Sequence, residues 1–302
     1  MEFKVRILGS SSALPTSERF PTSQVVLYNN IPYLLDCAEG TQMQMRKYHV
    51  PFGRLKNIFI SHLHGDHIFG IFGLLSSLNL LGRKQDLNIY APAKLKEIYE
   101  SVLNLNNNKL NYKINFHPLT GEEKTKIYEN KNLQVFSFPL KHSRQVFGFS
   151  FEEKQKQPNV MKDAIEEFNL SLKQILSLKN GEDLLINGRS VKNSKLTIKP
   201  SKPRAYAFCT DTIPLDYLKD IINGVDLLYH EATFGSDMED LAEQTMHTTA
   251  KQAAQLAKKV NAGKLVIGHF SSRYKTVNSL IKEANEFFPD TIEAKDGLLL
   301  DV

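Results

Sequence analysis

The chain has few cysteines and no long apolar run, and each shortage excludes a class of protein. Its two cysteines, Cys37 and Cys209, lie far apart and form no C-x-x-C pair. We therefore expect two buried thiols rather than a disulfide or a cysteine-based zinc site. The longest apolar stretch, Ile68 to Leu81, is interrupted by glycine and small polar residues. It is too short to span a bilayer.

An export signal is also missing from the start of the sequence. Met1 to Arg6 passes directly into strand-like alternation, without a cationic start followed by an apolar segment. We therefore expect a cytoplasmic protein with no membrane partner. The 302 residues carry a net charge of +5 and are 41% hydrophobic, enough for one large domain or two smaller ones. This charge permits an anionic substrate without requiring one.

Short strand-like runs alternate with helical ones along the chain. Apolar alternation predicts strands at 3–7, 25–27, 33–35, 58–60, 87–90, 135–138, 205–208, 227–229 and 265–267. Helical spacing of apolar residues predicts helices over 95–105, 250–260 and 277–287, the second capped by Thr248 or Thr249. Mixed strands and helices in two similar halves predict an α/β (α+β) fold of packed sheets with helices outside.

The most specific motif is Ser61-His62-Leu63-His64-Gly65-Asp66-His67, which directly follows the apolar run Ile58 to Ile60. Imidazole nitrogen and carboxylate oxygen suit a divalent zinc ion, and Gly65 eases the sharp turn that converging ligands need. The alternative is a polar loop that happens to be rich in histidine. The whole chain has only nine histidines, so their concentration here favours a metal site.

Further candidate ligands follow other predicted strands at the point where each strand ends. They are His142, Asp211, His230 and His269. If these strand ends share one edge, a rigid sheet would hold the loop residues in a common cleft. His142 alone would be interpreted as an ordinary structural histidine. The joint pattern favours a site.

These motifs resemble the metallo-β-lactamase superfamily, through the H-x-H-x-D-H pattern of residues 62–67 and the later His142, Asp211 and His269. Within it the chain resembles the ribonuclease Z family over nearly its whole length. The narrower resemblance rests on Leu8–Ser11, Asp36–Gln42, His230–Thr233, His247–Thr249 and Gly268–Tyr274. It implies one domain over residues 1–302, a metallo-β-lactamase-like αβ/βα four-layer sandwich with two packed mixed sheets and outer helices.

The resemblance also implies a ligand set. One zinc would take His62, His64 and His142, the other Asp66, His67 and His269, and Asp211 would bridge them. Two Zn2+ per subunit would supply a nucleophilic water near neutral pH and neutralise charge on a scissile phosphate. Mn2+ or another divalent ion stays open as the native metal.

Proton transfer and substrate contact are assigned by the same resemblance. Asp66 would accept a proton from the attacking water, and His247, oriented by Glu231, would protonate the departing ribose oxygen. Alternatively, His247 only begins a helix beside Thr248. His230 receives no chemical role. Three residues are expected to meet RNA phosphate, namely Arg273, Ser271 and, with a solvated surface arginine as the equal alternative, Arg19.

The segment between His142 and Asp211 is the place for an inserted RNA-binding arm. Residues 154–204 hold eleven Lys or Arg against five Asp or Glu. Such a segment would attract phosphates, although a charged run is often only a solvated face. The Gly-Pro dipeptide usual in the family's arm is absent around residues 169–174, where Asn180-Gly181 is the nearest turn signal. Ala38 and Thr210 also stand where glycine is usual.

The resemblance predicts a zinc-dependent endoribonuclease that removes the 3′ trailer from precursor tRNA and leaves a 3′-hydroxyl, working as a homodimer. Two alternatives stay open. Another hydrolase on the same scaffold would act on a small phosphodiester, sulfate ester or thioester. A non-catalytic RNA-binding protein would keep zinc for stability alone. This alternative explains the sequence least well, because every ligand and both proton-transfer candidates are present.

Overall fold

The computed structural model describes residues 2–104 and 110–302, and the chain forms two compact units. Unit 1 comprises Met1–Tyr128, Val135–Phe151 and Ala205–Val302, and unit 2 comprises Glu129–Gln134 and Glu152–Arg204. Unit 2 therefore contains the segment 154–204 singled out as an arm. Within the described residues, no helix has both the length and the apolarity that crossing a membrane requires.

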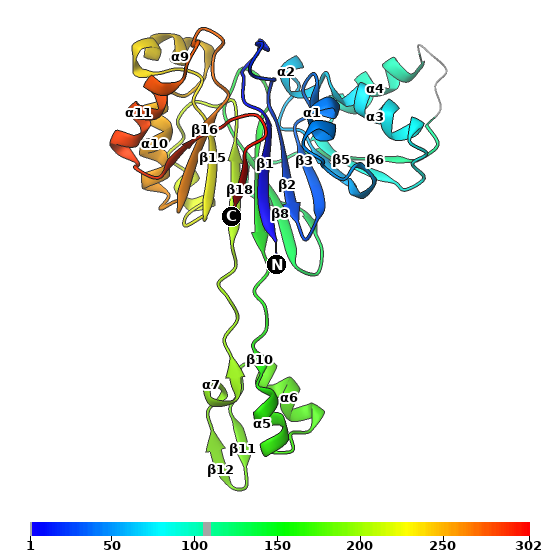
Figure 1. Ribbon diagram of the computed structural model, residues 1–302, viewed down its shortest axis with the longest axis vertical. Coiled ribbons are helices and arrows are strands. Elements are labelled where there is room, and N and C mark those ends of the chain that lie inside the picture. Colours follow the sequence, from blue (N-terminus) through cyan, green and yellow to red (C-terminus); the bar gives the residue numbers. More distant parts are fainter. Residues whose placement is uncertain (1, 105–109) are drawn as a thin grey trace. The chain divides into compact units, whose positions relative to one another are not determined.

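Unit 1 is built on two mixed sheets (Figure 1). In the described residues sheet 1 has the order β18 (Leu299–Asp301), β1 (Phe3–Gly9), β2 (Ser23–Tyr28), β3 (Ile31–Leu35), β4 (Asn57–Phe59), β5 (Leu87–Pro92), β6 (Ile114–Leu119). Sheet 2 has the order β17 (Thr291–Glu293), β16 (Lys264–Gly268), β15 (Leu227–Glu231), β14 (Ala205–Cys209), β9 (Phe147–Glu153), β8 (Leu133–Pro139), β7 (Thr125–Glu129). Every strand predicted from the sequence is confirmed.

The parallel halves of the two sheets decide where the loops meet. Strands β3 to β6 are parallel in sheet 1, and β14 to β17 are parallel in sheet 2. Loops that follow parallel neighbours leave from the same edge of a sheet. The register pairs Cys209 with His230 and Glu231 with Gly268, so the chain leaves β14, β15 and β16 at nearly one level.

Aromatic side chains join the two sheets face to face. Tyr33 and Phe59 of sheet 1 contact Phe151 of β9 edge to face, at centroid distances of 5.9 and 5.5 Å. Phe149 of the same strand lies 5.6 Å from Phe59. All four rings are fully buried, and each such pair adds about 0.5–1.5 kcal/mol to the hydrophobic burial.

Helices cover the outer faces of both sheets, which confirms the four-layer α/β sandwich (Figure 1). On the side of sheet 1 lie α1 (Thr41–Lys47), α2 (Gly65–Ile68), α3 (Ile71–Leu80) and α4 (Lys94–Asn104). On the side of sheet 2 lie α9 (Glu239–Thr245), α10 (Ala250–Lys259) and α11 (Asn278–Phe287). Unit 1 also contains α8 (Leu218–Ile221) and the short 3-10 helices Phe52–Arg54 and Ser236–Met238.

The helix predictions are confirmed to within a residue or two. Thr249, one of the two expected caps, forms a capping box with Gln252 at the start of α10, and Lys258 and Lys259 lie in the last turn. Both features stabilise helix ends. The prediction for 95–105 corresponds to α4, and its last residue, Leu105, lies outside the described residues.

Unit 2 has a small core of its own, formed by Ala164, Leu170, Leu178, Leu184 and Leu196. Its elements are β10 (Asn159–Val160), α5 (Lys162–Glu167), α6 (Leu172–Lys179), β11 (Leu184–Ile186), β12 (Arg189–Val191), α7 (Asn193–Leu196) and β13 (Thr197–Ile198). The segment that lacks the Gly-Pro dipeptide forms the turn between α5 and α6. In this turn Asn169 adopts a φ of 45°, and Ser171 caps α6.

Two Asn-Gly pairs shape unit 2. Asn180 and Gly181 end α6, as the sequence indicated. Asn187 and Gly188, with φ angles of 49° and 76°, join β11 to β12 in the two-residue turn that such a pair favours. The sequence analysis did not use this second signal.

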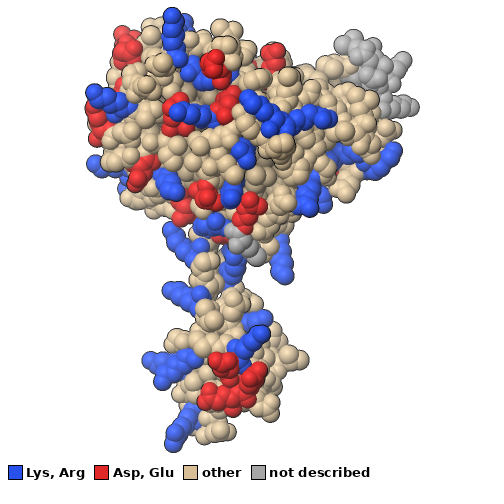
Figure 2. Space-filling view, in the orientation of Figure 1, with Lys and Arg blue, Asp and Glu red and all other residues tan. Residues whose placement is uncertain are grey.

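The two ends of unit 2 lie side by side. The Glu153 amide donates to the Arg204 carbonyl at 2.9 Å, and the Arg204 guanidinium donates to both carboxylate oxygens of Glu153. Lys154 pairs with Glu129 at 2.7 Å. For the nine other cations of residues 154–204, all among the described residues, no ion pair is recorded. In Figure 2 the visible acidic side chains of unit 2 form one patch, and Lys and Arg are spread over the rest of that face.

Candidate metal centre

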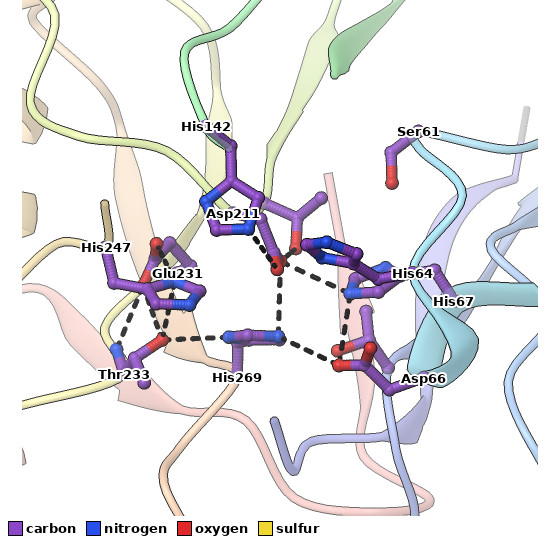
Figure 3. Close-up of polar contacts among 12 residues, drawn as sticks. Ser61, His64, Asp66, His67, His142, Asp211, Glu231, Thr233, His247 and His269 are labelled. Carbon is purple, nitrogen blue, oxygen red and sulfur yellow. Dashed lines mark hydrogen bonds and ion pairs between the residues drawn. The ribbon is translucent and has the colours of Figure 1, made fainter. Parts of the chain in front are cut away.

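The structure gathers the seven predicted ligands into two sets that share Asp211. His62, His64, His142 and Asp211 form one set, and Asp66, His67, Asp211 and His269 form the other. Within each set, one ligand atom per residue lies within 4.8 Å of all the others. Figure 3 shows these side chains converging from several loops on the Asp211 carboxylate.

Asp211 is central because its two carboxylate oxygens face different histidines. Oδ2 lies 3.5 Å from His62 Nε2 and 3.9 Å from His142 Nε2. Oδ1 lies 3.3 Å from His67 Nε2 and 3.1 Å from His269 Nε2. A carboxylate with this arrangement can ligate two ions at once.

Asp66 completes the second set. Its Oδ2 lies 3.5 Å from His67 Nε2 and 3.6 Å from His269 Nε2. In the first set, His62 Nε2 and His64 Nδ1 are 3.0 Å apart. Such spacings are those of atoms that share one central ion, given ligand distances of about 2.0–2.2 Å.

A buried carboxylate fixes the tautomers of His62 and His67. Asp36 Oδ2 accepts a hydrogen bond from His67 Nδ1 at 2.7 Å and another from Ser61 Oγ at 2.8 Å. Because Ser61 gives its only hydroxyl proton to Asp36, it must accept from His62 Nδ1, 3.0 Å away. When neutral, both rings therefore present an unprotonated Nε2 to the ligand cluster, as metal-binding histidines do. Burial opposes a charge on His67, but the carboxylates of Asp211, Asp66 and Asp36 raise its pKa well above the usual value, so a bound cation would displace a proton there.

Carbonyl and hydroxyl oxygens fix two further histidines in the same way. His142 Nδ1 donates to the Met246 carbonyl at 3.0 Å. Thr233 Oγ1 donates to Glu231 Oε2 at 2.7 Å, so it accepts from His269 Nδ1 at 2.8 Å. His269 Nε2 is buried, as is His67 Nε2, and neither makes a hydrogen bond to the described residues. These orphaned nitrogens fit a divalent cation.

Three residues at the centre have strained backbones. Asp211, Met246 and His269 have φ angles of 26°, 57° and 59°. Such left-handed conformations cost roughly 1–3 kcal/mol each and concentrate at functional sites. Here they turn ligands or ligand-holding carbonyls inward just after β14, α9 and β16.

Charge at the centre is unevenly shared. Burial disfavours ionisation of Asp66 and Asp211, yet neighbouring histidines hold the pKa of each carboxyl well below its usual range. Burial lowers the pKa of His64 to about 4, helped by His62 and His142. A neutral imidazole beside ionised carboxylates is the donor set that a divalent metal requires.

His247 and Glu231 form a buried pair beside the second set. His247 Nδ1 donates to Glu231 Oε1 at 2.8 Å, and Glu231 also accepts from the amides of Thr212 and Thr233, each at 3.0 Å. Burial opposes both charges, but the mutual attraction raises the pKa of His247 to about 9 and lowers that of Glu231 to about 2. The pairing therefore favours the protonated form of His247 at neutral pH.

One cavity of about 450 Å³ exposes this centre. His64, Asp66, His142, Asp211, His247 and His269 line it, together with Ser271 and Arg273. Of the residues predicted to contact phosphate, Ser271 and Arg273 therefore share a cavity with the ligands.

Arg19 is not brought to this cavity. It donates to the Tyr274 carbonyl at 2.8 Å and lines a separate cavity of about 530 Å³ with Lys47 and Asp296. His230 is also away from the centre: it is buried in β15, and its Nδ1 contacts the Glu231 carbonyl oxygen at 2.7 Å. Both cysteines are free and buried, as expected.

No role was predicted from the sequence for Asp36, Ser61, Thr233 or the Met246 carbonyl. Asp36 and Thr233 do follow strands β3 and β15 at the edge where the ligands follow theirs. The rule that located the ligands, applied to every polar residue after a strand, would have found both.

Comparison with known proteins gives full-length relatives. A protein of Bacteroides fragilis named Ribonuclease Z is 42% identical over 302 residues, which is 100% of this chain and 99% of that one. Another with this name, from Porphyromonas gingivalis, is 40% identical over 301 residues, or 99% of each. Residues 3–177 match the family model described as Anti-Pycsar protein Apyc1. That match ends before Asp211, Glu231, His247 and His269.

Solved structures agree with the fold. Human tRNase Z, short form, superposes with a TM-score of 0.72 at 25% identity and 99% coverage of both chains. The metallo-beta-lactamase fold protein YhfI from Bacillus subtilis gives the same TM-score at 17% identity, covering 100% of both chains. At that identity the second likeness shows the fold alone.

Proposed function

We propose, because this chain belongs to the ribonuclease Z family, that it cleaves the 3′ trailer from precursor tRNA with two zinc ions. The protein is a metal-dependent endoribonuclease of tRNA 3′ processing. The observation that carries the proposal is the pair of ligand sets that share Asp211. His247 and Glu231 lie beside His269 of the second set.

The first ion is assigned to His62, His64 and His142, the second to Asp66, His67 and His269, and both to Asp211. Bound there, the ions would supply a nucleophilic water near neutral pH and neutralise charge on the phosphate. The four Nδ1 hydrogen bonds keep the rings of His62, His67, His142 and His269 from turning away. Zinc suits this mixed imidazole and carboxylate set, and Mn2+ would use the same atoms.

Asp66 and His247 move the protons. Asp66 takes the proton of the attacking water, which its depressed pKa permits only transiently, and passes it to solvent through the cavity. The oxygen of that water forms a bond to phosphorus, and the phosphorus–oxygen bond to the ribose 3′-oxygen breaks. His247, charged and fixed by Glu231, donates its Nε2 proton to that oxygen. Arg273 and Ser271 hold the phosphate on the same wall.

Residues 154–204 are proposed to hold the body of the tRNA. Nine cations without recorded ion pairs among the described residues, and a small independent core, support this role. A homodimer in the cytoplasm is proposed by analogy with the family. Sedimentation that finds only monomer, or cell fractionation that finds the protein elsewhere, would contradict those two statements.

The decisive experiment is cleavage of a precursor tRNA, compared with a chromogenic phosphodiester, with and without chelator. We expect one cut, a 3′-hydroxyl on the tRNA, and loss of both activities when metal is removed. His247→Ala should slow cleavage while bound zinc is unchanged, whereas a loss of zinc would make His247 a ligand. Deletion of 154–204 should abolish RNA cleavage and spare the small ester. If the intact protein hydrolyses the small ester but does not cleave RNA, the alternative of a small-ester hydrolase on the same fold is favoured.

A further inference from the structure

Another cavity is lined by the proposed metal ligand His64. It has a volume of about 620 Å³, within the range of about 300–1,000 Å³ that small-molecule sites occupy. Leu63, Pro92 and Ala93 give it an apolar wall, and Lys94 and Arg144 give it two cations. His64 lines both this cavity and the one that contains His247.

The two cations are free to meet a ligand. Lys94 and Arg144 are exposed, and neither forms an ion pair within the part of the chain that the structure describes. They come from different elements, the start of α4 and the loop after β8, and both line this cavity. An apolar wall beside two cations suits a nucleotide, whose base packs on the wall while its phosphate faces the charges.

The position of His247 gives the direction of the RNA. His247 groups with Glu231 and His269, not with His64, and in Figure 3 His247 and His64 lie on opposite sides of Asp211. In the proposed reaction, water forms a bond to phosphorus, the bond to the 3′-oxygen of the tRNA breaks, and that oxygen takes the proton from His247. The tRNA 3′ end therefore lies on the His247 side.

We infer that the cavity beside His64 binds the first nucleotides of the 3′ trailer, with Lys94 and Arg144 contacting their phosphates. The trailer keeps the cleaved phosphate, so its chain continues from the centre away from His247. His64 lines both cavities, so the two adjoin at this side chain. This inference rests on the proposed function, because it takes its direction from the leaving oxygen.

The test uses the full-length, metal-loaded protein and two measurements. The first is binding of a 5′-phosphorylated RNA trinucleotide, labelled at its 3′ end, by fluorescence anisotropy. The double variant Lys94→Ala/Arg144→Ala should bind roughly tenfold more weakly, as expected for two exposed charge contacts. For this double variant, the slope of log affinity against log salt concentration should be shallower by about 0.7 per lost contact. Ala93→Phe, which fills the cavity without removing charge, should weaken binding but keep the salt slope.

The second measurement is cleavage of precursors whose trailers have one or six nucleotides. In the wild type the longer trailer should lower KM, and the double variant should lose that advantage. Lys96→Ala is the matched control: Lys96 lies on the same helix, is exposed, and pairs with Glu100 at 3.7 Å. It should behave as wild type.

The outcomes separate the two proposals. If the wild type cleaves precursor tRNA but the double variant retains both trinucleotide affinity and trailer dependence, the trailer site is wrong and the endonuclease stands. If the wild type cleaves no precursor tRNA, the proposed function fails and this inference fails with it.

Discussion

Replacing Asp36 by asparagine should weaken metal binding although Asp36 is not a proposed ligand. Its carboxylate is fully buried and accepts from the Ser61 amide at 2.7 Å, from Ser61 Oγ at 2.8 Å and from His67 Nδ1 at 2.7 Å. Asparagine keeps the shape but has one accepting oxygen. With that oxygen toward His67, the side-chain NH2 of the asparagine faces the Ser61 N–H, so two donors meet. With it toward Ser61 N, the amide faces His67 Nδ1 and favours the tautomer that protonates Nε2.

Either orientation costs free energy at the centre. Losing a partner that orients a metal-bound histidine typically reduces metal affinity 10–100-fold, or about 1.4–2.8 kcal/mol. The metal-free protein should also lose about 1–3 kcal/mol of unfolding free energy, because a buried donor is left unmatched.

Competition with a chelating dye measures the affinity, and chemical denaturation of the metal-free protein measures the stability. Asp86→Asn, at an exposed carboxylate before β5, is the control and should change neither. Unchanged zinc affinity in Asp36→Asn, in a protein that folds, would refute the tautomer reasoning.

Three further perturbations follow from the same geometry. His247 must be protonated to act as an acid and its pKa is raised to about 9, so kcat should fall as pH rises through that value. In Glu231→Gln the fall should begin at lower pH, and an unmoved profile would contradict the pairing. Chelation, starting from metal at 100 times its Kd, should reduce the unfolding free energy by about 2.7 kcal/mol, seen as a lower melting temperature that Asp211→Asn no longer shows. Changing Lys192, Lys195 and Lys199 together to glutamine should reduce the salt slope of precursor binding by up to roughly three, with kcat retained; an unchanged slope would remove these lysines from the RNA contact.

The sequence predicted the strands and the ligand cluster for one physical reason. Apolar alternation marks a strand without reference to distant residues, and ligands that follow strands inherit a common edge from parallel pairing. Asp211 and His269, which follow β14 and β16 in the parallel half of sheet 2, could therefore be placed at one edge although they are far apart in the chain.

Features that depend on contacts distant in sequence could not be predicted in this way. The left-handed backbones of Asp211 and His269 exist because the surrounding loops impose them, and no residue type announces that. Arg19 looked equally suited to phosphate or solvent, and its bond to the Tyr274 carbonyl depends on a loop more than 250 residues away. The hairpin at Asn187-Gly188 is different, because an Asn-Gly pair is a local signal that predicts such a turn from the sequence.

The junction between Glu153 and Arg204 has an evolutionary consequence. The chain enters unit 2 from β9 and leaves it into β14, and these strands are neighbours in sheet 2. The backbone hydrogen bond between Glu153 and Arg204 closes the inserted segment at its base. Lengthening or replacing a closed excursion costs little conformational entropy, since the penalty grows only with the logarithm of its length. Descendants of this gene could thus exchange one attached unit for another while inheriting the residues of the metal centre intact.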